Sequence, residues 1–505
     1  MAKRYRAFGN SFVLAALLIA VSATGAISAE EIRKPVVAGA FYPADAKELA
    51  REVDGFIKDA PKKELNGEVV ALLAPHAGYE YSGKIAGYAY KAVEGLKFDT
   101  IIVVGLSHRV LVDGAAIYPS GKFETPLGLV DIDKNLADEL MLETDRIKIM
   151  PQAHQFEHSV EVQIPFFQRA FKDFKIVPMV MNEPSFENIE KISDAISGAV
   201  KRSNKKILLI ASSDMSHYPN YLDANYVDKK SLEAIERFDV TAFLSYEAKA
   251  MQEGVSSLEC VLCGDAALSV VMASAKKLGA DKAVVLGYAN SGDATGDKSR
   301  VVGYGAVAFI KSSDAKKEDP AMFDPSTLDE GSKKELLAMA REAIRGQLDT
   351  GSLSKKPAAD KFKLNGAVFV TLTEGGELRG CIGQTQAVLP LGDAVRQMAV
   401  EAAFGDPRFR QISKDEFDKI KIEISILSPL KRVKDASEIT LRTHGVVVKR
   451  GFNSGIFLPQ VAEETGWSKE EFLNTLCAQK AGLPKDAWKD PKTELYVFTV
   501  EKFHE

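Results

Sequence analysis

The chain has 505 residues, with 65 Lys and Arg against 70 Asp and Glu, so its formal net charge is −5. Hydrophobic residues make up 46% and charged residues 27%, which excludes a mainly disordered chain and a polytopic membrane protein. The near-neutral charge gives no basic footprint for nucleic acid, so no nucleic-acid partner is expected. Four cysteines are too few for a disulfide scaffold, and the length suits roughly two to four domains.

Residues 1–29 have the three-part pattern of a secretory signal peptide. Basic residues within the first six positions precede an apolar run from Phe12 to Val21, and small residues follow up to Ala29. The run is shorter than the roughly 20 residues that a membrane span needs, so no transmembrane domain is expected beyond this segment. We expect cleavage near Ala29 and an exported, periplasmic protein. An uncleaved anchor in the inner membrane and a cytoplasmic protein are the alternatives.

Residues 30–312 show an alternation of strands and helices, which predicts an α/β domain. Continuous apolar runs predict strands that are buried on both faces of a sheet, at Val69–Leu73, Thr100–Val104, Ile207–Ile210 and Ala283–Leu286. Helical stretches between them include Ser82–Val93 and Asp228–Phe238.

Residues 313–329 are polar and contain two prolines, which predicts a linker. Residues 330–505 then read as a smaller α+β domain. Its predicted helices are Lys333–Asp349, Leu391–Ala403 and Lys469–Lys480, and its predicted strands are Gly366–Leu372, Lys421–Leu427 and Leu495–Val500.

Three of the predicted strands run directly into loops that carry a histidine. These histidines are His76, His108 and His217. Ligand sites in open parallel sheets form at the carboxyl ends of the strands, so the three loops are expected to lie together. Imidazole is the commonest protein ligand for zinc, iron and copper, and the usual general base near pH 7. The pattern therefore favours a functional site over three unrelated turn residues.

Cys260 and Cys263 form a single C-x-x-C motif just before the predicted helix Ala266–Lys277. The pair could be half of a zinc site, a redox pair, or the source of one thiolate ligand for the histidine site. Two small buried apolar residues are the simplest interpretation.

The segment His154–His158 matches H-x-x-E-H, a pattern of zinc proteases. On one helix His154 and His158 would bind zinc, and Glu157 would act as the base of a hydrolase. Pro151 and the alternating residues Ser159–Ile164, which favour an extended segment, argue against this interpretation.

Taken together, the motifs of the first domain resemble those of the Memo family. They are Pro75–Tyr79, Gly105–His108, Glu157–Glu161, Ser212–His217 and Leu262–Gly264. This family is similar to the class III extradiol dioxygenases, which use non-haem Fe(II) at a site on a sheet with flanking helices. The second domain resembles an AMMECR domain through Leu378–Gly383, Ala403–Phe409 and Glu423–Pro429. The combination resembles the AmmeMemoRadiSam system, which implies a radical SAM protein as a partner.

The resemblance implies metal ligands at His76, His108 and Cys263. It implies His217 as the acid/base, with Asp214 beside it. Iron(II) is the expected metal, copper the next choice and zinc the least expected. A thiolate in place of the usual carboxylate ligand is softer and favours Cu(I) or zinc, which argues against simple ring cleavage.

Cys381 lies between Gly380 and Gly383, and glycines permit a tight turn or the close approach of another backbone. One hypothesis makes Cys381 a catalytic nucleophile or thiol carrier whose pKa is lowered by Arg379. The other makes it a structural cysteine. Arg408 could also lie near it.

These observations lead to a first hypothesis of a metal-dependent redox enzyme whose substrate, of unknown identity, is received, presented or modified by the second domain. The rival hypothesis is a binding or scaffold module that keeps a dioxygenase-like fold without catalysis. The zinc hydrolase is a third hypothesis.

Overall fold

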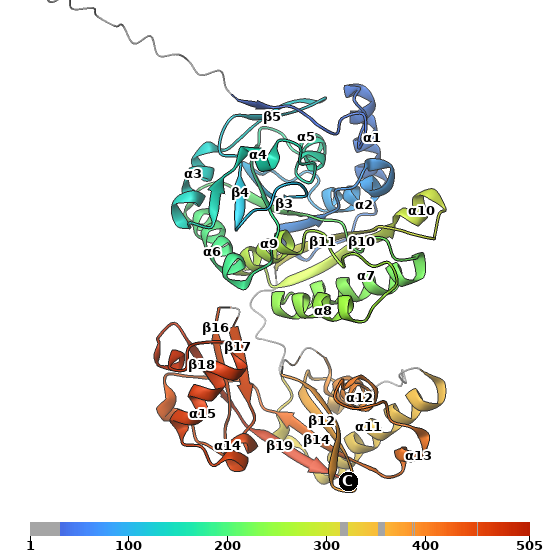
Figure 1. Cartoon of the computed structure of the whole chain (residues 1–505), viewed down its shortest axis with the longest axis vertical. Helices are drawn as coiled ribbons and strands as arrows, with labels where there is room; N and C mark the ends of the chain where they lie inside the picture. Colours follow the sequence, from blue (N-terminus) through green and yellow to red (C-terminus); the bar gives the residue numbers. More distant parts are fainter. Residues whose placement is uncertain (1–30, 314–321, 352–358, 386, 388, 452) are drawn as a thin grey trace, which may run out of the picture.

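The computed structural model describes residues 31–313, 322–351, 359–385, 387, 389–451 and 453–505 (Figure 1). The predicted signal peptide therefore lies outside the described residues, and the predicted linker lies partly outside them. Within the described residues, no helix combines the length and the apolar character needed to cross a membrane.

The first domain is built on an eight-stranded mixed sheet, in the order β10-β11-β2-β9-β3-β8-β4-β7. The central strands β2, β9, β3 and β8 are parallel neighbours. The strands of this sheet are β2 (Gly67–Ala74), β3 (Thr100–Leu106), β4 (Ala115–Ile117), β7 (Ile147–Ile149), β8 (Lys175–Met181), β9 (Ile207–Ser212), β10 (Lys282–Asn290) and β11 (Gly303–Ser312). A small sheet contains β1 (Ile32–Arg33), β5 (Lys122–Thr125) and β6 (Gly128–Asp131).

Helices cover both faces of the large sheet. The alternate residues of β3 pack into two different hydrophobic clusters, one on each face. Ile101 and Val103 pack into one hydrophobic cluster, whereas Ile102 and Val104 pack into the other. Strands buried on both faces need apolar side chains at every position, which explains the continuous runs in the sequence. The helices of this domain are α1 (Ala46–Asp59), α2 (Tyr79–Lys91), α3 (Lys134–Glu143), α4 (Pro151–His154), α5 (Ile164–Ala170), α6 (Phe186–Arg202), α7 (Tyr221–Glu236), α8 (Val240–Gln252), α9 (Asp265–Lys277) and α10 (Ser291–Thr295).

The second domain contains two four-stranded antiparallel sheets, each covered by helices (Figure 1). One sheet, in the order β13-β12-β14-β19, contains β12 (Ala367–Glu374), β13 (Glu377–Gln384), β14 (Ile420–Leu427) and β19 (Val500–His504). The other, in the order β15-β18-β16-β17, contains β15 (Lys431–Val433), β16 (Gly445–Arg450), β17 (Asn453–Phe457) and β18 (Glu494–Phe498). The helices are α11 (Glu330–Thr350), α12 (Leu391–Val400), α13 (Lys414–Phe417), α14 (Gln460–Thr465) and α15 (Lys469–Thr475).

Three local predictions need correction. The strand predicted at Ala283–Leu286 is the half-buried edge strand β10, because only β11 pairs with it. The segment Ser159–Ile164 is not extended: a 3₁₀ turn at Glu161–Gln163 leads straight into α5. The strand predicted at Leu495–Val500 is divided between β18 and β19, which belong to different sheets.

Candidate metal centre

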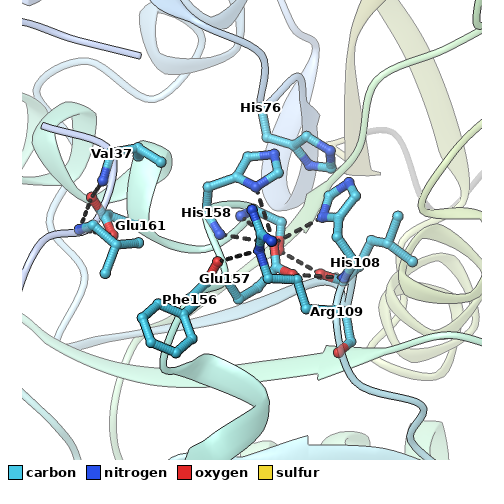
Figure 2. A network of polar contacts seen from close by, with 12 residues as sticks. Val37, His76, His108, Arg109, Phe156, Glu157, His158 and Glu161 are labelled. Atoms are coloured by element: carbon cyan, nitrogen blue, oxygen red, sulfur yellow. Dashed lines mark hydrogen bonds and ion pairs between the residues drawn. The ribbon is translucent and has the colours of Figure 1, made fainter. Parts of the chain in front are cut away.

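His76, His108 and His158 converge at the carboxyl ends of the central strands (Figure 2). His76 follows β2, His108 follows β3, and His158 lies in the loop between α4 and the turn before α5. The ring centroids are 5.2 Å apart for His76 and His108, 5.4 Å for His76 and His158, and 4.4 Å for His108 and His158. One ring nitrogen from each histidine lies within 4.8 Å of the other two, so the group could hold a metal ion.

The hydrogen bonds around His76 determine its tautomer. The hydroxyl of Ser212 donates to the carbonyl of Ser159 (2.6 Å) and accepts a hydrogen bond from Nε2 of Gln163 (2.7 Å). The amide of Gln163 is oriented by two further contacts: its Nε2 donates to the carbonyl of Pro75 (2.8 Å), and its Oε1 accepts from the hydroxyl of Tyr90 (2.6 Å). Ser212 Oγ has no second proton, so it must accept from Nδ1 of His76, at 3.3 Å. Nε2 of His76 is left with a bare lone pair that can bind a metal.

Glu157 determines the tautomer of His108 in the same way. Its Oε1 lies 2.9 Å from Nδ1 of His108, and its Oε2 accepts from the backbone N–H of that residue at 2.6 Å. A carboxylate only accepts hydrogen bonds, so Nδ1 of His108 carries the proton. The lone pair of Nε2 is therefore the one that can bind a metal. The backbone N–H groups of His158 and Ser159 also donate to Oε1, each at 2.8 Å. A carboxylate behind a ligating histidine is a common arrangement in metal sites.

The same contacts control the ionisation of Glu157. Burial by itself raises the pKa of this carboxyl group, but the hydrogen bond and charge of His108 and the N–H of Ser159 outweigh burial and lower the pKa to about 2. Burial lowers the pKa of His76 to about 3 and that of His158 to about 4, and neighbouring imidazoles act in the same direction. His76 and His158 are therefore neutral near pH 7, which is the form of imidazole that binds metals.

Cys263 lies beside the histidine cluster. Its Sγ is 3.3 Å from Nε2 of His76, on the nitrogen that carries the bare lone pair. The sulfur also accepts from the backbone N–H of Asp214 at 3.3 Å and lies 3.5 Å from the hydroxyl of Ser213. Burial and the charge of Asp214 raise the pKa of the thiol. Cys260 and Cys263 are both free cysteines, so the C-x-x-C pair forms no disulfide in this structure.

Asp214 and His217 follow β9, as the sequence indicates. Oδ1 of Asp214 accepts from the backbone N–H groups of His76 (2.7 Å) and Ala77 (3.2 Å), so this carboxylate holds the loop that carries His76. Nε2 of His217 is buried and has no hydrogen-bond partner among the described residues. Burial lowers the pKa of His217, whereas Asp214 raises it. A neutral imidazole with a free nitrogen suits exchange of a proton with a bound molecule.

His154 lies apart from this cluster. Helix α4 ends at His154, so His154 and His158 do not share the face of one helix. Nε2 of His154 lies 3.1 Å from the carbonyl of Ala116, and the ring packs edge-on against Tyr118. The H-x-x-E-H segment supplies His158 and Glu157 to the cluster, but not as a zinc-protease helix. Sequence reasoning placed His158 in that alternative site only. The Memo-like motif Glu157–Glu161 contains His158 and was the signal that could have linked this residue to the first site.

Cys381 is half-buried on β13 in the second domain, where its Sγ accepts from the hydroxyl of Thr371 at 3.3 Å. Its backbone N–H donates to Asp406 (2.8 Å), and its carbonyl accepts from Arg408 (3.1 Å). The hydrogen bonds and the ion pair of Arg379, which was expected to act on this thiol, lie with other groups.

The guanidinium of Arg379 pairs instead with the buried Glu416 and donates to the carbonyls of Arg410 and Gln411. A Cβ on Gly380 would lie 2.1 Å from the carbonyl oxygen of Ala402, so this glycine permits the close approach of another backbone.

Comparison with known proteins agrees with this architecture. The family model of Memo-like proteins matches residues 33–308, and the model of AMMECR1 matches residues 337–503. A MEMO1 family protein of Nitrosopumilus maritimus is 38% identical over 284 residues, which cover 55% of this chain and 100% of that protein. A MEMO1 family protein of Saccharolobus solfataricus is 37% identical over 290 residues, covering 55% of this chain and 99% of that protein.

Among solved structures, an uncharacterized protein from Pyrococcus horikoshii is 38% identical and covers 34% of this chain and 90% of its own, with a TM-score of 0.31. The two family models together account for most of the described residues. The chain therefore belongs to the Memo-like family and carries an AMMECR1 domain after its Memo domain.

Proposed function

We propose that the Memo domain is a non-haem, metal-dependent redox enzyme whose ion is held by His76, His108 and Cys263, with His158 within reach as a fourth ligand. The observation that carries this proposal is the cluster of three imidazoles with ligand nitrogens within 4.8 Å of one another. The network around His76 and His108 supports it, because both rings point a bare lone pair away from their hydrogen-bond partners. Fe(II) is our first choice of metal and copper the second, while zinc is the least favoured.

A bound iron or copper ion would supply one-electron and O₂ chemistry that amino acid side chains lack. The residues of the chain would contribute position and proton transfer. Asp214 holds the backbone of the loop that carries His76, and Glu157 holds the ring of His108. His217, with its buried unpartnered Nε2, would accept or return the proton of a substrate bound beside the metal.

The test is elemental analysis of the full chain, purified without oxygen or chelator. His108→Ala, Cys263→Ala and His158→Ala are compared with wild type, and His504→Ala serves as a control because His504 is exposed and lies in the other domain. We expect near-stoichiometric iron or copper in wild type and in the control, and loss of that metal in His108→Ala and Cys263→Ala. If Cys263→Ala kept the metal and His158→Ala lost it, the third ligand would be His158 and not the thiolate of Cys263.

Other outcomes would reject parts of the proposal. A zinc-only protein would favour hydrolysis or a structural metal. Absence of metal from every folded sample would favour the non-catalytic binding module and would leave Cys381 as the remaining candidate catalytic residue.

Where samples do hold iron or copper, their activity with O₂ is measured next.

We also propose that the protein is exported and that a radical SAM protein acts in the same system. Fusion of residues 1–29 to a reporter that is active only outside the cytoplasm tests the first point. An inactive reporter would favour a cytoplasmic protein. The cytoplasm supplies the reducing conditions that a radical SAM partner needs.

A further inference from the structure

A pocket of the Memo domain, about 450 Å³ in volume, is lined by three carboxylates and by no Lys, Arg or His. The carboxylates are Glu247 on α8, Asp265 at the start of α9, and Glu259 in the loop between these helices. Apolar side chains form the remaining wall. Its volume falls within the range of sites for small molecules.

Glu247 is the feature that needs an explanation. The residue is only 8% exposed, and its Oε2 is buried without a hydrogen-bond partner among the described residues. Burying an unpaired carboxylate is costly, so such a group is normally paired or kept protonated. Burial and the nearby charge of Asp265 both raise the pKa of Glu247, so a cationic group placed beside these two carboxylates would stabilise their charged forms. Glu259 is different, since it pairs with Arg300 at 3.0 Å.

The apolar wall of the pocket is also incompletely covered. Phe186 is 40% exposed and Met251 is 44% exposed, although both are large hydrophobic side chains and both line the pocket. An occupant that covered them would gain hydrophobic stabilisation. The complementary occupant is therefore cationic at one end, where it meets Glu247 and Asp265, and apolar along its stem.

We infer that this pocket binds an organic cation, an alkylammonium or guanidinium group carried on an apolar stem. Such groups present several N–H donors and can bridge two carboxylates that are separated in space. A bare metal ion fits less well. The described residues contain a single group whose ligand atoms lie close enough together for an ion, and that group is the histidine cluster. The cation belongs either to a free amine or to a lysine or arginine side chain of a partner.

The pocket is separate from the proposed metal centre, although a segment that lines it, residues 259–262, leads directly to Cys263. Cys260 lines the pocket, whereas Cys263, three residues later, contacts His76 through its sulfur. Occupation of the pocket can therefore be tested independently of the metal. A variant that lacks the metal, His108→Ala, should still bind the cation.

The experiment measures binding of n-butylammonium and n-butylguanidinium to the full chain by calorimetry and ligand-detected NMR, with 1-butanol as an uncharged probe. We expect both cations to bind, and the alcohol to bind at least tenfold more weakly. Glu247→Gln keeps the shape of the side chain and removes its charge, so it should weaken cation binding at least tenfold. Glu253→Gln is the matched control, because Glu253 pairs with Lys249 outside the pocket.

Thermal unfolding checks that Glu247→Gln is folded, and Asp265→Asn provides a second variant with the same expected direction. N-acetyl-lysine and N-acetyl-arginine methylamides test the side-chain source: binding as tight as that of the free cations favours a peptide partner, and weaker binding favours a free amine. Equal binding of butanol, or cation binding unaffected by Glu247→Gln, would overturn the inference. Binding of Mn²⁺ or Zn²⁺ that depends on Glu247, in place of the organic cations, would also overturn it.

Discussion

Replacing Ser212 by alanine tests the argument that its hydroxyl determines the tautomer of His76. The hydroxyl donates to Ser159 O and accepts from both Gln163 Nε2 and His76 Nδ1. Without it, the proton of His76 can move to Nε2, the nitrogen that faces Cys263 and would bind the metal. Ser212→Ala should therefore weaken metal binding without removing a ligand.

The size of the effect follows from these contacts. Loss of a partner behind a ligating histidine typically lowers metal affinity about 10- to 100-fold, which corresponds to roughly 1.4–2.7 kcal/mol. The substitution also leaves the carbonyl of Ser159 without the donor at 2.6 Å, in a residue that is fully buried. An unsatisfied buried polar group costs about 1–3 kcal/mol, so the metal-free protein should lose stability by a similar amount.

The assay is a competitive titration of metal-free protein with Fe(II) and a chelator under anaerobic conditions, together with urea unfolding. Ser274→Ala is the matched control, because Ser274 is also buried and its hydroxyl donates to the carbonyl of Val270 (2.7 Å) inside α9, away from the site. An unchanged Fe(II) affinity in folded Ser212→Ala would refute the tautomer argument. An equal loss of Fe(II) affinity in Ser274→Ala would show that the effect comes from general destabilisation of the fold.

Three further predictions concern stability. Glu161→Gln leaves the buried partner Arg33 with an uncompensated charge, so the free energy of unfolding should fall by about 3–5 kcal/mol in urea denaturation. Gly380→Ala should destabilise the AMMECR1 domain by about 1–3 kcal/mol in thermal unfolding, because the new methyl group meets the backbone of Ala402. For Glu157, the folded pKa of about 2 lies below the ordinary value of 4.5, so the unfolded chain binds the proton first as pH falls. Its contribution of roughly 3 kcal/mol is present above pH 4.5 and is lost as pH falls towards 2, and urea unfolding of metal-free wild type and Glu157→Gln across this range measures it.

Controls separate these effects from general fragility. Asp54→Asn breaks an exposed ion pair with Arg169 and should cost less than about 1 kcal/mol. Gly55→Ala adds a methyl group where no atom lies within 4 Å and should not destabilise helix α1. A loss for Glu161→Gln no larger than that for Asp54→Asn, or a stable Gly380→Ala, would contradict the packing described above. A difference between wild type and Glu157→Gln that persists unchanged at pH 2 would contradict the assigned pKa.

Much of the architecture could be predicted because it depends on local patterns. The continuous apolar runs at β2, β3 and β9 identify strands that are buried on both faces, and the structure confirms them. The position of a histidine after a strand predicts which edge of the sheet it reaches, so His76 and His108 were expected together and do lie together. The structure also brings Cys263 against His76, with its sulfur 3.3 Å from Nε2 of that ring.

The sequence by itself therefore determined the two domains, their α/β and α+β classes and the edge at which His76 and His108 gather, because hydrophobic periodicity is a property of short segments. Only the tertiary structure decided that His158 completes the cluster while His154 does not, because α4 ends at His154, whose ring nitrogen lies against the carbonyl of Ala116 instead. It also decided which polar groups meet: Arg379 pairs with Glu416, and the neighbours of Ser212 determine the tautomer of His76. Such pairings join residues far apart in the chain, and the choice among partners depends on the packing of whole elements, which no local pattern contains.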